Sequence, residues 1–149
     1  IGGATARDVL RIPTRAGEAL YYELVWTESY GDDRRTEACA ILRYPLPGPL
    51  PLMRIKPEGV FGLANNDLTT EWQEFNREFD VKTDDERVGQ AVLTKPVQEF
   101  LMDRLRGERL AFDGDGVFLW IHRYDVEDVD RCVKLMEELT ALIPAAAYE

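Results

Sequence analysis

The chain has 149 residues, of which 18 are basic and 28 acidic, and its formal net charge is -10. Hydrophobic residues make up 45% of the sequence, enough to build a globular core without disulfides or a structural metal. The acidic balance repels phosphate backbones and anionic lipid headgroups, so nucleic acid is disfavoured as a partner. The sequence contains no apolar run of about 18 residues, so no segment of it is expected to span a membrane.

The sequence predicts one domain that follows a short N-terminal segment. Residues 1–18 show no sustained hydrophobic period, and we expect them to be flexible or loosely ordered, with regular structure beginning near Ala19. Residues 19–149 are interpreted as a single α+β domain without an internal repeat. Because the chain begins at Ile1 rather than Met, we expect it to be part of a longer protein.

Two β-prone segments predict an antiparallel hairpin at the start of this domain. Residues 20–28 alternate, with Leu20, Tyr22 and Leu24 on one face of a strand. The turn formers of residues 29–35 separate this strand from the β-prone residues 38–44.

A proline-rich segment follows, with Pro45, Pro47, Pro49 and Pro51 in seven residues. Proline disfavours a regular helix and a central strand, so we predict an extended, polyproline-like crossing. It would either bind an aromatic groove on a partner or cover an edge of the protein's own sheet, and its leucines favour the second role. Residues 52–55 then predict a short strand, and residues 56–66 a loop.

Residues 72–83 fit two periods. Trp72, Phe75 and Phe79 have helical spacing, whereas Phe75, Phe79 and Val81 alternate as in a strand. We predict a strand at about residues 74–83, because Phe79 and Val81 lead directly into a helix-capping sequence.

The next segment holds four acidic residues that are either a metal site or the start of a helix: Asp80, Asp84, Asp85 and Glu86. The spacing of an EF-hand is absent. Asp84 or Asp85 is a good N-cap residue, and acids in a first turn face the positive end of the helix dipole. The sequence therefore favours a helix start over a metal site.

Two helices are predicted after this cap. The first carries an apolar stripe that includes Val88 and Val92, and the second begins at Thr94 with Pro96 in its first turn and ends before Gly107. A further amphipathic helix is predicted at about residues 126–143, ended by Pro144.

Residues 108–124 predict a second hairpin, with a tight turn at Asp113-Gly114-Asp115-Gly116. The order of elements indicates an α+β fold with a mainly antiparallel sheet built of hairpins, a central helix pair and a C-terminal amphipathic helix packed on it.

Candidate site residues are few. Asp113 and Asp115 could hold a cation, but Asp-Gly is also ordinary turn chemistry. His122 is the only histidine, so a catalytic relay or a histidine-containing metal site would have to use it, and a structural role is favoured. Glu37 and Asp125 would act as an acid–base pair only if the fold brought them together. No catalytic residue, cofactor or metal ligand is assigned.

Cysteine and tryptophan residues are interpreted as structural. Cys39 and Cys132 lack metal-ligand spacing and favour buried free thiols over a disulfide. Trp26, Trp72 and Trp120 are expected in the core rather than at an interface.

From Phe75 onward the chain resembles a family of actinobacterial domains of unknown function. The shared phrases are FNREFDV (75–81), the acidic pair Asp84-Asp85, AVLTKPVQEFL (91–101) and RLAFDGDGVFLWIH (109–122). Members of that family are soluble modules that follow transmembrane helices. The resemblance implies a membrane-anchored parent chain, although no such helix is present here, and it carries no catalytic residue.

These observations lead to a functional expectation with one alternative. We expect a non-enzymatic, soluble module that mediates interaction with a protein partner or self-assembly. It would be cytoplasmic and tethered to the cytoplasmic membrane only through a segment absent from this chain. The alternative is a small-ligand or metal-binding sensor or enzyme that uses carboxylates near residues 113–116 or His122.

Overall fold

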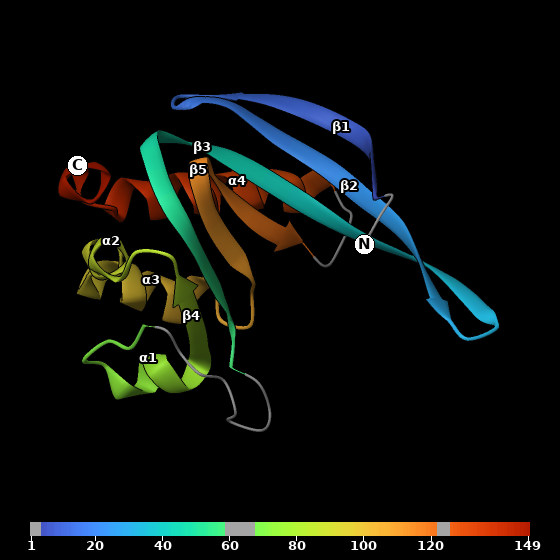
Figure 1. Cartoon of the computed structure of the whole chain (residues 1–149). Coiled ribbons are helices and arrows are strands. Elements are labelled where there is room, and N and C mark those ends of the chain that lie inside the picture. The colour runs from blue at the N-terminus through green and yellow to red at the C-terminus, as the bar shows by residue number, and fades with distance from the viewer. Residues whose placement is uncertain (1–3, 59–67, 122–125) are drawn as a thin grey trace.

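The computed structural model describes residues 4–58, 68–121 and 126–149. Within these residues the chain forms a five-stranded antiparallel sheet and four α-helices, which confirms the predicted α+β fold (Figure 1). The elements in chain order are β1 (Thr5–Thr14), β2 (Gly17–Tyr30), β3 (Asp33–Pro57), α1 (Gln73–Glu78), β4 (Phe79–Thr83), α2 (Glu86–Val92), α3 (Lys95–Arg104), β5 (Leu110–Ile121), α4 (Val126–Leu142) and the short 3-10 helix η1 (Ala145–Tyr148).

Strand β3 organises the sheet, because three other strands pair with it. Its first part pairs with β2 up to Arg43, and its last part pairs with β4 from Met53 onward. Strand β5 pairs with the opposite edge of β3 on both sides of a sharp bend (Figure 1). The 25 residues of β3 therefore join every part of the sheet.

The prediction that the prolines exclude a central strand is wrong. The prolines belong to β3 and lie at its bend. Between two paired positions there, β3 advances five residues, from Pro45 to Leu50, whereas β5 advances only two, from Gly116 to Gly114. Proline is tolerated here because the bulge interrupts the hydrogen-bond ladder. The other edge of β3 also has no paired strand between Arg43 and Met53 in the described residues.

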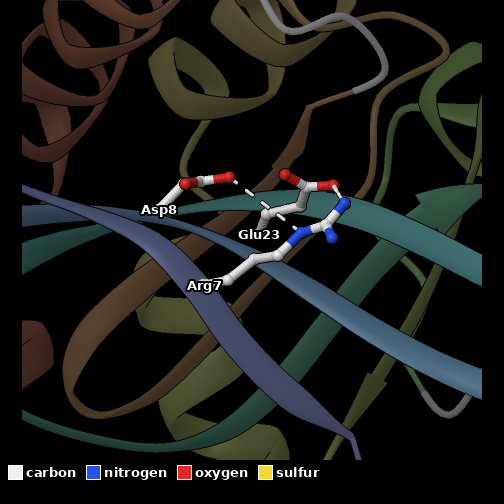
Figure 2. Close-up of polar contacts among 3 residues, drawn as sticks. All are labelled: Arg7, Asp8 and Glu23. Carbon is white, nitrogen blue, oxygen red and sulfur yellow. Dashed lines mark hydrogen bonds and ion pairs between the residues drawn. The ribbon is translucent and has the colours of Figure 1, made fainter.

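Residues 5–14 form β1, so regular structure begins well before Ala19, contrary to the prediction. The strand pairs with β2 but is largely exposed, and it therefore lacks the apolar alternation of a half-buried strand. A bulge interrupts it at Asp8, which has a φ of 53°. Figure 2 shows Arg7 at this bulge, 2.8 Å from the Glu23 carboxylate, and this hydrogen bond lowers the pKa of Glu23.

The predicted strand at residues 74–83 is half wrong, because its first part is the helix α1. The Asn76 side chain accepts a hydrogen bond from the Thr70 backbone N–H at 2.9 Å and donates one to the Thr70 carbonyl at 2.8 Å. These bonds fix the chain entering α1. Phe75 and Phe79 are four residues apart, as the helical period requires, and their rings stack with centroids 5.1 Å apart.

The predicted helix starts are confirmed. Asp85 is the N-cap of α2, and its carboxylate accepts a hydrogen bond from the Val88 backbone N–H at 3.2 Å. Thr94 is the N-cap of α3. The predicted amphipathic helix is α4, and an apolar stripe of α4 and the residue after it is buried in the core: Val129, Cys132, Met136, Leu139 and Ile143.

The second predicted hairpin is not formed. Its two β-prone runs are the two limbs of the single strand β5, bent near Gly114, which has a φ of 61°. Both limbs pair with β3, and the Trp120 backbone N–H donates to the Arg109 carbonyl at 3.0 Å across the bend. The glycines thus supply a bend, as positive φ allows, rather than a tight turn.

Replacing Asp85 with alanine should remove the α2 cap and destabilise the fold by about 1 kcal/mol, lowering the melting temperature by about 2–4 °C. Asp84→Ala is the matched control, since this neighbouring side chain is exposed and does not occupy the N-cap position. Calorimetry of the two variants checks the assignment, and equal losses would contradict it.

Candidate functional site

The two faces of the sheet have different surroundings. Ala19, Tyr21, Ala40 and Leu42 point toward the buried core, which they share with apolar residues of the helices. Because side chains alternate along a strand, their neighbours point to the opposite face. In the described residues the helices lie on the core side of the sheet (Figure 1).

The opposite face carries half-buried apolar side chains, and we call the part formed by β2 and β3 the open face. Its half-buried apolar members are Leu20, Tyr22, Leu24, Trp26 and Cys39, and the charged residues Glu37 and Arg43 lie on the same face, opposite Trp26 and Leu20. Ile41 lies opposite both Tyr22 and Trp120, so Trp120 of β5 shares this side of the sheet.

The expectation that the tryptophans belong in the core is confirmed only for Trp72, which is half-buried and packs against the core, and is wrong for Trp26 and Trp120. Trp26 and Trp120 lie on the open side of the sheet. Trp72 packs against the core at the other side, and Lys95 Nζ lies 3.5 Å from the centre of its ring.

A cavity of about 530 Å³ lies on the open side, where the last part of β3 meets β4 and β5. Strand pairing explains which side chains reach it. Arg54 lies opposite both Lys82 and Ala111, and Lys56 lies opposite Asp80, so these residues share one face. The bend of β5 adds Phe118 and Trp120 to the same cavity.

Asp80 is the most unusual residue in this cavity. Phe79 and Val81 on either side of it point into the core, so Asp80 points the other way, toward the cavity. It is 1% exposed, and neither of its carboxylate oxygens has a hydrogen-bond partner. Lys56 Nζ is 3.8 Å from Oδ2, which is an ion pair but too long for a hydrogen bond.

The cavity is also basic in an acidic protein. Four cationic side chains line it, namely Arg54, Lys56, Lys82 and Arg109. Two carboxylates oppose them, Asp80 and Asp113, which leaves a net lining charge of four minus two, or +2. A cavity with a buried acceptor, several cations and two aromatic side chains is suited to a small, polar, anionic ligand.

The structure separates the acidic residues singled out in the sequence. Asp85 caps α2, while Asp80 lies in the cavity on β4. Nowhere in residues 4–58, 68–121 and 126–149 do three His, Cys, Asp or Glu side chains form a group that could hold a metal ion.

The predicted residues around the glycine-rich bend have different surroundings. Asp113 lines the cavity, whereas Asp115 pairs with Arg43 at 2.6 Å. Glu37 is half-buried on β3. His122 and Asp125 lie outside the described residues.

Sequence reasoning considered Asp80 only as part of a metal site and missed the cavity. The available signal was an acidic residue between Phe79 and Val81, two apolar residues with strand alternation. The basic residues of the cavity come from β3, β4 and the start of β5, so their convergence depends on strand pairing.

The two cysteines are free thiols, as predicted. Cys132 is buried, but Cys39 is only half-buried on the open face. Desolvation raises the pKa of both thiols. Each is therefore a weaker nucleophile at neutral pH than an exposed cysteine.

Comparison of the chain with family models, with curated proteins and with solved structures finds no match. Among the described residues, no helix has the length and apolar character needed to cross a membrane. The candidate site therefore rests on the geometry of the cavity and of the open face.

Asp80→Asn should stabilise the ligand-free protein by about 1 kcal/mol. Burying the Asp80 charge without hydrogen bonds costs more free energy than its ion pair with the half-exposed Lys56 contributes. Chemical denaturation at neutral pH measures the change. Glu78→Gln, which removes a carboxylate from the surface pair with Arg106, is the control and should change stability by less than about 0.5 kcal/mol. A clear loss of stability in Asp80→Asn would show that the ion pair supports the fold.

Proposed function

We propose that this chain is a non-enzymatic interaction module that assembles with a second copy of itself through the open face. The observation that supports the proposal is the row of half-buried apolar side chains on β2 and β3 that the described helices leave uncovered. An apolar sheet face gains free energy when a second layer covers it.

A second copy is a suitable occupant for geometric reasons. Two sheets pack face to face at about 10 Å, with their strands nearly aligned, when their twists match. Two copies of one sheet have the same twist by necessity. A twofold arrangement would also place Trp26 of each copy on the same patch of the other, as an isologous interface requires.

The net charge of the chain opposes this assembly, so self-assembly should depend on salt concentration in a specific way. Each copy carries a formal charge of -10, so two copies repel one another at low ionic strength. Salt screens this repulsion over about 8–10 Å at physiological concentrations. Self-assembly should therefore strengthen as salt is raised, opposite to the behaviour of a complex held by charge pairs.

Attachment to a membrane is a further part of the proposal, and it is based on the resemblance alone. We propose that the parent protein belongs to the actinobacterial family described above and holds this module at the cytoplasmic side of the membrane. Tethering would raise the local concentration of the module and favour a weak self-contact.

Sedimentation velocity over the micromolar range should show a concentration-dependent dimer, and Trp26→Ser should weaken it by about tenfold or more, because buried tryptophans dominate interfaces. Leu142→Ser is the control, since it removes an apolar side chain that is 38% exposed on α4, away from the open face. A chain that stays monomeric at all salt concentrations would contradict self-assembly. Equal weakening by both variants would contradict the open face as the contact.

Alkylation of Cys39 provides an independent test. This thiol should react with iodoacetamide slowly in the monomer, since desolvation raises its pKa, and several-fold more slowly when the dimer covers it. Cys132, buried on the core-facing side of α4, should react only on unfolding at either concentration. Mass spectrometry of the two peptides measures both rates, and a Cys39 rate independent of protein concentration would count against the contact.

A further inference from the structure

Two hollows on the open side of the sheet share one wall. The cavity of about 530 Å³ described above adjoins a second hollow of about 320 Å³, because Arg109 and Trp120 line both. The Trp120 backbone N–H donates to the Arg109 carbonyl at 3.0 Å, and this hydrogen bond fixes the shared wall. The two hollows are therefore the two ends of one elongated site.

The larger end carries cations that the protein leaves unpaired. Arg54 on β3, Lys82 on β4 and Arg109 just before β5 line it, and all three are exposed. Within the described residues, none of these three side chains forms a hydrogen bond or an ion pair. Lys56 differs, since it pairs with Asp80, whose oxygens are buried and out of contact with any ligand. The three unpaired cations are therefore available to an anion that enters from solvent.

The charge of this end specifies the anion. Its net lining charge is +2, as counted above. A phosphate monoester carries about -1.5 to -2 at neutral pH and offers three terminal oxygens, whereas a carboxylate carries a single charge and offers two oxygens. Three cations on three separate segments of the chain thus match a phosphate group better than a carboxylate.

The smaller end is mostly apolar. Trp26, Cys39 and Ile121 line it, and apart from Arg109 on the shared wall its described lining residues are uncharged. Trp120 continues this apolar surface into the larger end. An alkyl chain that leaves water for such a surface gains up to about fourfold in affinity for each buried methylene.

We propose that this elongated site binds a phosphate monoester that carries an alkyl chain, as in a single-chain lipid phosphate. The phosphate group contacts Arg54, Lys82 and Arg109. The chain runs along Trp120 into the smaller hollow, where it packs against Trp26 and Cys39.

This inference does not rest on self-assembly, although the two share a surface. Trp26 and Cys39 belong to the open face, so the bound chain and a second copy compete for it. A protein that binds the ligand but stays monomeric would support this site and contradict only self-assembly. A protein that dimerises without binding the ligand would do the reverse.

The test is calorimetric titration of the whole chain with dodecyl phosphate, hexyl phosphate and dodecylphosphocholine, each below its micelle concentration. Dodecyl phosphate should bind about tenfold or more tightly than hexyl phosphate, because its longer chain buries more methylenes. Dodecylphosphocholine has the same chain, but its choline cancels the phosphate charge, so it should bind about tenfold or more weakly than dodecyl phosphate. Equal affinities within either pair would overturn the proposal, as would no binding of any probe.

Two charge reversals test the phosphate end. Lys82→Glu should weaken dodecyl phosphate binding by about tenfold or more, whereas Lys134→Glu makes the same change at an exposed position of α4 outside both hollows. Equal effects of the two reversals would reduce the site to a general charge effect and overturn it.

A tryptophan variant tests the chain end. Trp26→Ser should reduce the advantage of dodecyl over hexyl phosphate by about fivefold or more, and Leu142→Ser should leave this ratio unchanged. The ratio is measured within one variant, so a partial loss of folded protein does not alter it. An unchanged ratio in Trp26→Ser would show that the chain does not enter the smaller hollow.

Discussion

The structure depends on the pairing of one long, bent strand with three others. Strand β3 pairs with β2 before its bend and β4 after it, and β5 follows it along the opposite edge. The bend is possible because the extra residues between Pro45 and Leu50 bulge out of the ladder, opposite Gly114 and Gly116. Without this bend, β4 and the two limbs of β5 would not meet around one cavity.

The sequence predicted those elements whose signals are local. Asp85 and Thr94 identified two helix starts because an N-cap is a contact between residues three apart in the chain. Helix α4 was recognisable because its apolar stripe repeats with the helical period. The first hairpin was recognisable from its two β-prone runs, although its turn is only the two residues between Tyr30 and Asp33 rather than the predicted loop at residues 29–35.

The wrong predictions share a physical cause, which is that long-range pairing decided the outcome. The limbs of β5 have the local composition of a hairpin, but each gains more by pairing with β3. Prolines are tolerated in the central strand β3 because its ladder with β5 is interrupted between Pro45 and Leu50. Asp80 could be recognised as exceptional only once β4 was placed, because its burial depends on neighbours distant in sequence.

Asp80 also indicates why the cavity differs from an ordinary surface hollow. A protein selected only for stability would place an apolar residue between Phe79 and Val81, since a carboxylate without hydrogen bonds costs free energy there. Local rules of stability are most often broken at functional sites, where the cost is balanced by binding. The cations gathered around this residue, in a chain of net charge -10, are a second departure from the average surface at the same place. The two departures are linked, because one of the cations, Lys56, pairs with Asp80 at 3.8 Å.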